Sequence, residues 1–425
     1  MWDSKAKYLI ILKNVVDNII KIYYIKTMLK AYEYRIYPTS QQEEIFNQTL
    51  GLCRLYWNIV VFNKNQEHNM QIEGYKPTFE KFKPEALEWI KNIDSTPLAQ
   101  MWSDVRAAYT NFFKSLKGER KGKFSKPPRF KSKKNPKDSF RYSCLCTNCK
   151  IDENGLYVTR KLGYIQGSFG CRFAQGKWKN ITFRRTATGK WFVKICVEKK
   201  DEPKNKNGKI IAIDWNCRDE DFIVRSDGVK IKCPRYLRKS QKQLKHWQKI
   251  MSKRYVSGSE TQSSNYEKAK RKVALLHEHI AWQRKDWLHK ESRKLCNEFE
   301  TIVVEDINLQ TMAKMNHGVV ISDQGFGMFR EMVSYKGHLE KVNPKNTSKT
   351  CHICGYVNPK VKVGVNYWKC PICGESHDRD INAALNILSK YVTSQSIVGW
   401  ELTEIRNACG EPRSSVKQEN CLTSA

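Results

Sequence analysis

The chain has 425 residues, which is enough to bury the cores of two or more domains. Its 76 Lys and Arg residues outnumber its 43 Asp and Glu residues, and the formal net charge of +33 suits nucleic acid as a partner better than it suits solubility alone. Of the fifteen cysteines, eleven are scattered outside any ligand motif, and this odd number favours reduced thiols in an intracellular protein. No apolar run is long enough to span a membrane and no secretory signal is visible, so we expect no membrane partner.

The first predicted elements are a strand and a helix that follow an N-terminal extension of residues 1–28. Residues 30–37 alternate apolar and polar side chains, which is typical of a strand. Thr39 and Ser40 are residue types that cap helices, and Ser40 with Glu43 matches a capping box. Apolar residues then recur at spacings of four and three, which predicts a helix with one buried face: Phe46, Leu50, Cys53, Trp57 and Val60.

A second helix is predicted from Ser95 to Gly118, where a glycine stops an apolar stripe. Residues 117–138 then carry ten basic and two acidic residues, with glycines and prolines that break regular structure. Basic side chains neutralise phosphates and aromatic rings stack on bases, so this segment is a candidate nucleic-acid contact; a solvated linker is the alternative. The candidate contact residues are Arg120, Lys121, Lys123, Arg129, Phe130, Lys131 and Lys133.

Residues 140–198 are predicted to be rich in strands and to form a small β-barrel. The turn at residues 186–189 lies between two alternating runs, which predicts a hairpin. A second metal site in this region is an alternative to plain reduced thiols, although no fourth ligand has motif spacing. The three cysteines concerned are Cys144, Cys146 and Cys149.

Two apolar runs in the second half of the chain each end in an acidic residue. Residues 209–213 lead into Asp214, and residues 302–304 lead into Glu305. A long, basic helical pair is predicted between them over residues 236–298. An acid at the end of a buried strand is well placed to bind a metal at the edge of a sheet, although single acids end many strands.

Two Cys-x-x-Cys pairs, separated by fifteen residues, predict a four-thiolate zinc site. The alternative is four unrelated buried cysteines. Because protein ligands fill all four positions, we expect one structural Zn²⁺ ion that shapes the fold. The predicted ligands are Cys351, Cys354, Cys370 and Cys373.

A third acid, Asp380, opens an amphipathic helix directly after the predicted zinc site. With Asp214 and Glu305 it would provide oxygen ligands for two Mg²⁺ ions, with Mn²⁺ as a substitute. Two such ions activate water and stabilise the leaving oxygen of a phosphodiester. In a strongly basic chain, this set of acids favours a nuclease.

Several segments of the chain occur in an order that is more specific than any one of them. They are Ala31-Tyr-Glu-Tyr-Arg-Ile-Tyr-Pro38, Pro128-Arg-Phe-Lys-Ser-Lys133, Ala212-Ile-Asp-Trp215, Val304-Glu-Asp-Ile-Asn308 and His377-Asp-Arg-Asp-Ile-Asn-Ala-Ala-Leu-Asn386. From roughly residue 29 onward, the chain therefore resembles the TnpB family of transposon-encoded RNA-guided DNA endonucleases. Relatives of that family include the Fanzor proteins and the miniature type V CRISPR effectors.

The resemblance implies an α+β multidomain fold, in which an RNase H-like RuvC nuclease domain follows a wedge domain. The expected domains are an N-terminal extension (1–28), a wedge β-barrel (29–200) with a helical recognition insert (about 39–117) and a basic linker (117–138), a RuvC-like nuclease domain (201–397) with the inserted four-Cys zinc ribbon (347–376), and a flexible C-terminal tail (398–425).

The resemblance also implies a function. Asp214, Glu305 and Asp380 match the three RuvC acids and would be the catalytic metal ligands. The protein would act as a monomer that binds a guide RNA from the transposon end, recognises a short motif in double-stranded DNA and cleaves the guide-complementary target. It would lie in the cytoplasm and nucleoid of a prokaryotic host, or in the nucleus of a eukaryotic one. A nuclease-inactive guide-directed repressor and an RNase H-like DNA-strand transferase are the alternatives.

Two departures from the family pattern concern the expected RuvC sheet. Asn216 stands where the family usually has glycine, and asparagine tolerates the positive φ that a turn there would need. Residues 335–342 form a shorter connection between helix and strand than is usual for the family.

Overall fold

The computed structural model describes residues 27–69, 93–120, 122–133, 139–144, 149–170, 176–200, 205–216, 221–259, 261–312, 318–362 and 364–408. The chain divides into two compact units, residues 1–202 and 203–425. Nearly all of the expected N-terminal extension lies outside the described residues, as do Lys121, Cys146 and residues 409–425 of the expected tail. In the described part of the chain, no helix combines the length and the apolar character that crossing a membrane requires.

The first unit is built on a seven-stranded antiparallel sheet with the order β2-β6-β7-β1-β5-β4-β3. The predicted hairpin is confirmed as β6 and β7. Among the described residues, β2 and β3 form the two ends of the sheet, so the predicted β-barrel is observed as a half-barrel. The strands are β1 (Thr27–Tyr37), β2 (Ser139–Ser143), β3 (Lys150–Asp152), β4 (Gly155–Tyr157), β5 (Tyr164–Ser168), β6 (Lys177–Arg185) and β7 (Trp191–Lys200).

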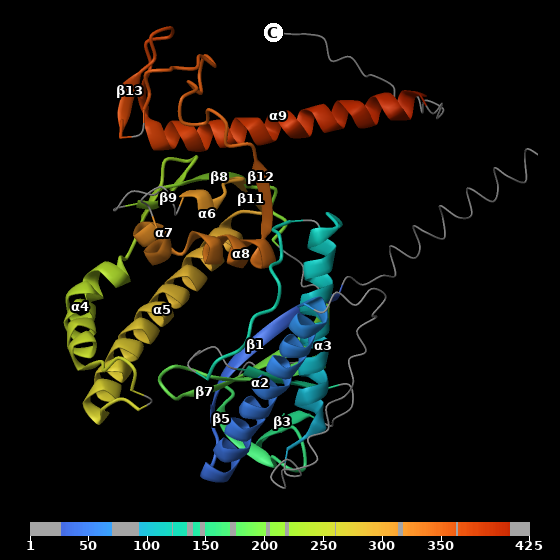
Figure 1. The fold of residues 1–425 in the computed structure, drawn as a ribbon. Helices are drawn as coiled ribbons and strands as arrows, with labels where there is room; N and C mark the ends of the chain where they lie inside the picture. The colour runs from blue at the N-terminus through green and yellow to red at the C-terminus, as the bar shows by residue number, and fades with distance from the viewer. Residues whose placement is uncertain are drawn as a thin grey trace, which may run out of the picture. The chain divides into compact units, whose positions relative to one another are not determined.

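The two predicted helices are confirmed as α2 (Ser40–Asn69) and α3 (Ser95–Leu116), which lie side by side over the sheet (Figure 1). Their apolar stripes join the sheet in one core. Phe46 of α2 is fully buried, and its ring centroid lies 4.9 Å from that of Phe183 and 5.0 Å from that of Trp191. The first unit is therefore held together by aromatic side chains from helix and sheet.

The residue that caps α2 is Thr39, so the predicted Ser40–Glu43 capping box is corrected. The backbone N–H of Gln42 donates to Thr39 Oγ1 at 3.3 Å, and the Gln42 side chain accepts from the Thr39 N–H at 3.0 Å. The Gln42 amide also donates to the carbonyls of Leu162 and Tyr164, which ties the start of the helix to the sheet. These additional partners explain why the box forms one residue earlier than the pattern indicated.

Replacing Thr39 by alanine is expected to lower the free energy of unfolding by about 1 kcal/mol, because a helix N–H loses its partner. Ser40→Ala is the matched control and should change it by less than half as much. Urea unfolding followed by tryptophan fluorescence measures both variants. A larger loss for Ser40→Ala would show that the cap has been assigned to the wrong residue.

The second unit contains a five-stranded sheet with the order β10-β9-β8-β11-β12. Strands β8, β11 and β12 are parallel, whereas β9 and β10 are added antiparallel at one side. The bounds are β8 (Ile210–Trp215), β9 (Asp221–Arg225), β10 (Lys230–Lys232), β11 (Thr301–Glu305) and β12 (His338–Val342).

Helices cover both faces of this sheet (Figure 1). On one face, Ile211, Ile213 and Val304 pack with apolar residues of α5 and α8. On the other face, Ala212 and Val303 pack against Ile387 of α9. The helices are α4 (Tyr236–Arg254), α5 (Ser264–Glu298), α6 (Leu309–Met312), α7 (Gly318–Gln324), α8 (Phe326–Lys336) and α9 (Arg379–Ala408). Helix α9 continues past residue 398, the expected start of the tail.

The short connection between α8 and β12 consists of Gly337 alone. A Cβ added to this glycine would lie 2.9 Å from Cys296 Sγ of α5, closer than real Cβ atoms approach a neighbour. Strand β12 then pairs in parallel with β11 over its full length. The edge of the sheet is therefore complete despite the shortened connection, because glycine allows the chain to pass tightly over α5.

Candidate functional site

Asp214 and Glu305 lie on neighbouring parallel strands, β8 and β11. The register of the two strands pairs Val303 with Ala212 and Val304 with Ile213, so the next pair along them is Glu305 and Asp214. Side chains alternate between the faces of a strand, so both acids share the face that carries Ala212 and Val303. That face is covered by α9. The two carboxylates therefore meet beneath this helix.

Asp380 lies in the first turn of α9 and is 7% exposed. Its Oδ2 accepts a hydrogen bond of 3.1 Å from the Asn216 side-chain amide, and Asn216 itself is buried. The positive φ expected at Asn216 is not observed, because the positive-φ residues other than glycine in the described chain are Arg235 and Asn346. Asn216 instead serves as a side-chain partner of the acid, a role that a glycine would not fill.

The electrostatics of the three acids reflect their proximity. Burial raises the pKa of Asp214 well above its usual range, and the charges of Glu305 and Asp380 raise it further. Burial also raises the pKa of Glu305, against the opposing effect of a hydrogen bond from Thr347 and the charge of Lys390. A cation would relieve this repulsion, so the donor set fits hard metal ions. In the described residues, however, the ligand oxygens of the three acids do not all lie within 4.8 Å of one another. The sulfurs of the four predicted zinc ligands, by contrast, do.

Two further acids adjoin the set but have other partners. Asp306, next to Glu305, is exposed and accepts a hydrogen bond of 3.0 Å from Lys341 Nζ. Asp378 Oδ1 accepts from the backbone N–H groups of Asp380 and Ile381, so Asp378 caps α9. Asp306 and Asp378 are thus engaged in contacts outside the set formed by Asp214, Glu305 and Asp380.

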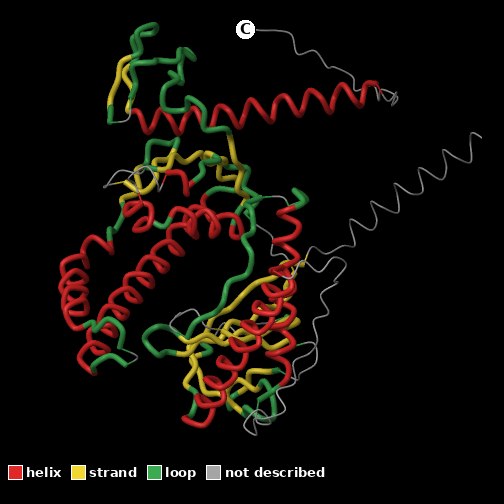
Figure 2. Tube along the Cα trace, viewed as in Figure 1, coloured by secondary structure: helices red, strands yellow, loops and turns green. Residues whose placement is uncertain are grey.

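The four predicted zinc ligands form the one group of metal-binding type found among the described residues, with sulfurs that all lie within 4.8 Å of one another. The Sγ atoms of Cys351 and Cys373 are 3.6 Å apart, and those of Cys354 and Cys370 are 3.5 Å apart. A tetrahedral site with Zn–S bonds near 2.3 Å requires sulfurs about 3.8 Å apart, so the cluster fits Zn²⁺. Figure 2 shows that the surrounding segment is mostly loop, with the short strands β13 (Tyr367–Lys369) and β14 (Ser376–Asp378).

Three buried polar side chains next to the acids were missed in the sequence: Thr347, Asn382 and Asn386. Thr347 Oγ1 donates to the Glu305 carboxylate. The Asn386 amide donates to the carbonyls of Thr347 and Thr350 at 2.8 and 2.7 Å. The available signal was the pair of asparagines four residues apart on the inward face of an apolar helix, because buried amides there require partners.

The basic segment after α3 is attached to α2 in its described part. The Trp57 indole N–H donates to the Arg129 carbonyl at 2.9 Å, and Asn58 exchanges two hydrogen bonds with the Lys131 backbone. Lys131 Nζ lies 3.9 Å from the Trp57 ring centroid, so the ammonium group forms a cation–π contact with this ring. The Phe130 ring is 57% exposed. Residues 129–131 are therefore packed on α2, whereas a solvated linker would make no such contacts.

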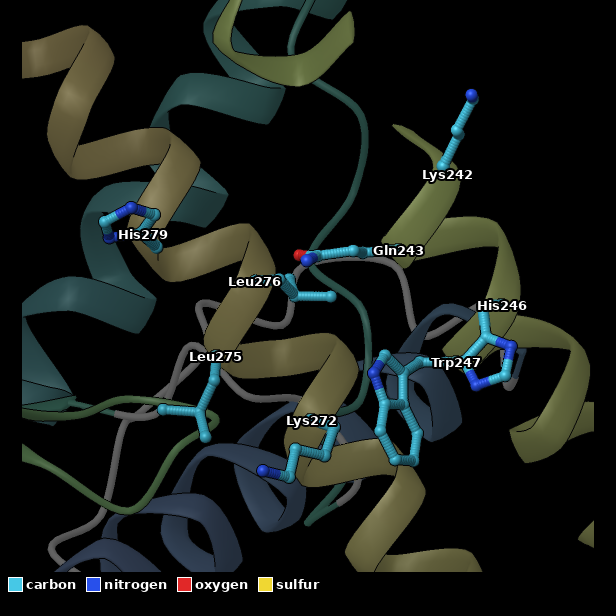
Figure 3. Close-up of a pocket in the computed structure, with 8 residues that line it drawn as sticks. All are labelled: Lys242, Gln243, His246, Trp247, Lys272, Leu275, Leu276 and His279. Carbon is cyan, nitrogen blue, oxygen red and sulfur yellow. The ribbon is translucent and has the colours of Figure 1, made fainter. Parts of the chain in front are cut away.

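A second basic surface lies on α4. This helix carries seven Lys and Arg residues, all exposed, and no acidic residue. Between α4 and α5 is a groove in which the Trp247 ring of α4 lies near Lys272 of α5, whereas Lys242 lies farther along α4 and extends away from that ring (Figure 3). We call it the α4–α5 groove. Its lining residues are Lys242, Gln243, His246, Trp247, Lys272, Leu275, Leu276 and His279.

Three family models match parts of the chain. Their descriptions are "Helix-turn-helix domain" for residues 28–71, "Probable transposase" for residues 194–316 and "Cas12f1-like, TNB domain" for residues 326–387. In the first region the described residues form strand β1 followed by the single long helix α2. The helical hairpin that the first description names is therefore not seen in residues 28–69.

The chain is also similar to curated proteins along nearly its whole length. A "Putative RNA-guided DNA endonuclease" of Streptomyces pristinaespiralis is 30% identical over 92% of this chain and 96% of its own length. The "Putative RNA-guided DNA endonuclease InsQ" of Escherichia coli (strain K12) is 29% identical over 85% of this chain and 92% of its own. The "TnpB-like protein L79" of Acanthamoeba polyphaga mimivirus is 28% identical over 30% of this chain.

Among solved structures, the chain is similar to the mini-RNA-guided endonuclease CRISPR-Cas_phi3, with a TM-score of 0.43 and 10% identity over 86% of this chain and 92% of that one. At that score the likeness is loose and carries no detail of the site. The near-complete match to the Streptomyces protein, together with the transposase and TNB domain models, is decisive: this chain belongs to the TnpB family.

Proposed function

We propose that this chain is an RNA-guided DNA endonuclease of a transposable element. It binds a guide RNA from the end of the element, recognises a short motif beside the target and hydrolyses the guide-complementary DNA. The observation that carries this proposal is the placement of Asp214 and Glu305 on one face of a sheet, with Asp380 in the first turn of α9, the helix that covers this face.

The three acids would hold two Mg²⁺ ions, or Mn²⁺, which would supply an activated water and stabilise the leaving oxygen of the phosphodiester. The chain contributes ligands on rigid elements: two from adjacent parallel strands and one from a helix packed across them. Asn216 and Thr347 orient two of the carboxylates through hydrogen bonds. The four-cysteine cluster would hold a structural Zn²⁺ ion, because it leaves no position for a substrate.

Guidance by RNA is supported by the names of the two long relatives and by the character of the basic surface. Seven exposed cations without an acid on α4 suit a phosphate backbone, and such contacts position nucleic acid without reading its sequence. Base pairing with a guide would then supply the sequence specificity. A transposon-encoded repressor would need the same surface but not the acids, so the intact acid set favours the nuclease.

Replacing Lys242 and Lys249 of α4 by glutamine is expected to weaken binding of the co-purifying RNA roughly tenfold at 0.15 M salt, since each phosphate contact releases counterions. The slope of log affinity against log salt concentration should become shallower by roughly 1.4, because each phosphate contact with a single strand contributes about 0.7 to that slope. The measurement is a filter-binding titration at several salt concentrations.

The matched control for that pair is Lys290→Gln with Lys294→Gln on α5. These lysines are exposed too, but each forms an ion pair with an acid of its own helix, Asp286 and Glu291. The control should bind RNA with nearly unchanged affinity and salt slope. Equal losses in both double variants would show that only total charge matters and that α4 is not a specific contact surface.

The proposed function is tested by changing the guide. The chain is reconstituted with its co-purifying RNA or with the same RNA carrying a new guide segment, and each complex is offered DNA that matches the old or the new guide. Cleavage is expected to follow the guide and to require RNA. RNA-free protein that cuts the old target with unchanged preference would refute guidance, and persistent binding without cleavage by the wild-type complex would favour the repressor.

A further inference from the structure

The segment that follows β12 and leads into the predicted zinc ribbon contacts both the acid site and the four-cysteine cluster. We call residues 343–352 the connecting segment; it contains the first zinc ligand, Cys351. Near its middle, Thr347 is 3% exposed, and its hydroxyl donates to Oε1 of Glu305. The hydroxyl also lies 3.2 Å from the Pro344 carbonyl, but its single proton goes to the closer partner, the carboxylate.

Two asparagines of α9 fasten the connecting segment to the helix that carries Asp380. Asn386 uses both of its amide hydrogens, on the carbonyls of Thr347 and Thr350. Asn382 donates to the Thr350 carbonyl at 2.8 Å and accepts from the backbone N–H of His352 at 3.1 Å. Both asparagine side chains are buried, Asn386 at 6% and Asn382 at 1% exposed, although the carbonyl and N–H partners at Thr350 and His352 are only partly buried.

The connection continues into the zinc site. His377 lies just before α9 and is 4% exposed, and its Nε2 is 3.1 Å from Cys351 Sγ. The His377 ring packs against those of His352 and Trp368, with centroids 5.0 and 4.6 Å away. The start of α9, the first zinc ligand and the hydroxyl that supports Glu305 are thus joined by a continuous set of contacts.

We propose that Thr347 is a positioning residue for the acid site, and that the connecting segment makes the geometry of Glu305 depend on the zinc ribbon. Thr347 touches no reacting group; it orients a carboxylate that would bind a metal ion. Asn382 and Asn386 hold the connecting segment, and with it the Thr347 hydroxyl, at a fixed position relative to α9. The positions of the Glu305 and Asp380 carboxylates are therefore determined by one rigid unit. This inference rests on the proposed nuclease function, because it concerns the ligands of that site.

The expected effect is on metal affinity. Partners that hydrogen-bond to metal ligands typically contribute 10- to 100-fold to the affinity for the metal. Thr347→Val keeps the shape of the side chain and removes the hydroxyl, so Glu305 loses its orienting hydrogen bond. Thr347→Ser keeps the hydroxyl and should restore the affinity.

The experiment measures binding of Mn²⁺ to the full-length chain by electron paramagnetic resonance, with Asp214→Asn defining the part of the signal that belongs to the acid site. Thr347→Val is expected to weaken that binding at least about tenfold. Cleavage by the RNA-loaded chain should require correspondingly more Mg²⁺ but approach the wild-type rate at saturation. Zinc content and thermal unfolding should match those of the wild type.

The matched control is Thr350→Val in the same segment, because the Thr350 hydroxyl donates to the Asn346 carbonyl at 2.8 Å and to no carboxylate. It should leave Mn²⁺ binding unchanged. Equal loss in Thr350→Val and Thr347→Val, or failure of Thr347→Ser to restore binding, would overturn the inference, because the effect would then come from the fold of the segment.

The dependence on zinc is tested with Cys373→Ser, which removes an exposed zinc ligand. This variant should also weaken Mn²⁺ binding, and combining it with Thr347→Val should weaken it by less than the sum of the two free-energy changes, because both act through the connecting segment. Additive effects would overturn the coupling. If the wild-type chain shows no Mn²⁺ binding that Asp214→Asn abolishes, the proposed function is wrong. If the wild type and Thr347→Val bind Mn²⁺ equally well at the acid site, only this inference is wrong.

Discussion

Replacing any one of Asp214, Glu305 or Asp380 by alanine is expected to stop DNA cleavage, with a loss on the order of a thousandfold or more. Removing a metal ligand takes away several kcal/mol of charge stabilisation in the transition state, and each 1.36 kcal/mol corresponds to about a factor of ten in rate. Binding of RNA and DNA should be retained, because the exposed cations of α4 lie on a different element from the acids. The measurement is single-turnover cleavage of labelled target by the RNA-loaded chain, with a mobility-shift assay for binding.

The matched control for the acids is Asp306→Ala. Asp306 adjoins Glu305, but its carboxylate is exposed and paired with Lys341, so its loss should change the cleavage rate by no more than a few-fold. An inactive Asp306→Ala beside an active Glu305→Ala would mean that the strand β11 presents the other acid to the substrate. In that case the proposed site itself would be wrong.

Cys370→Ser is expected to lower the zinc content of the purified chain well below one ion per molecule and to reduce cleavage strongly. Cys370 is buried within the four-cysteine cluster, whose surroundings have few regular hydrogen bonds besides two three-residue strands. A bound Zn²⁺ ion would therefore supply much of the free energy that folds this segment. Zinc content is measured by plasma emission spectrometry, and local unfolding by limited proteolysis.

The control for the zinc prediction is Cys233→Ser, which alters a half-buried cysteine of the same unit outside the cluster. It should keep its zinc, its resistance to protease and its cleavage rate. Full zinc content after Cys370→Ser would show that Cys370 is not a ligand. Loss of zinc with unaltered cleavage would show that the ribbon is not needed to build the acid site.

Much of the architecture could be predicted from patterns within short stretches of sequence. Alternation in β1, apolar stripes in α2 and α3, and short apolar runs in β8 and β11 are all confirmed as elements. The spacing of the four cysteines likewise predicted a cluster that the structure forms. These predictions succeed because each depends on residues that are close in sequence and on a periodicity that the backbone imposes.

The corrected details are those in which distant residues compete with a local pattern. Gln42 forms the capping box of α2 with Thr39 and also donates hydrogen bonds to the carbonyls of Leu162 and Tyr164. These additional hydrogen bonds favour the Thr39–Gln42 box over the predicted Ser40–Glu43 box. Asn216 lacks the expected positive φ and contacts Asp380 instead, 164 residues away.

By itself, the sequence determined the family, the elements that carry the three acids, and the four-cysteine cluster. Only the tertiary structure decided how the acids are supported. Thr347 reaches Glu305 across 42 residues, and Asn386 reaches Thr347 across 39. No periodicity records such contacts, because a buried threonine or asparagine looks the same in sequence whether its partner is a backbone carbonyl or a carboxylate. The partner is set by which strand and helix happen to be packed beside it, and that packing is the sum of many weak contacts over the whole unit.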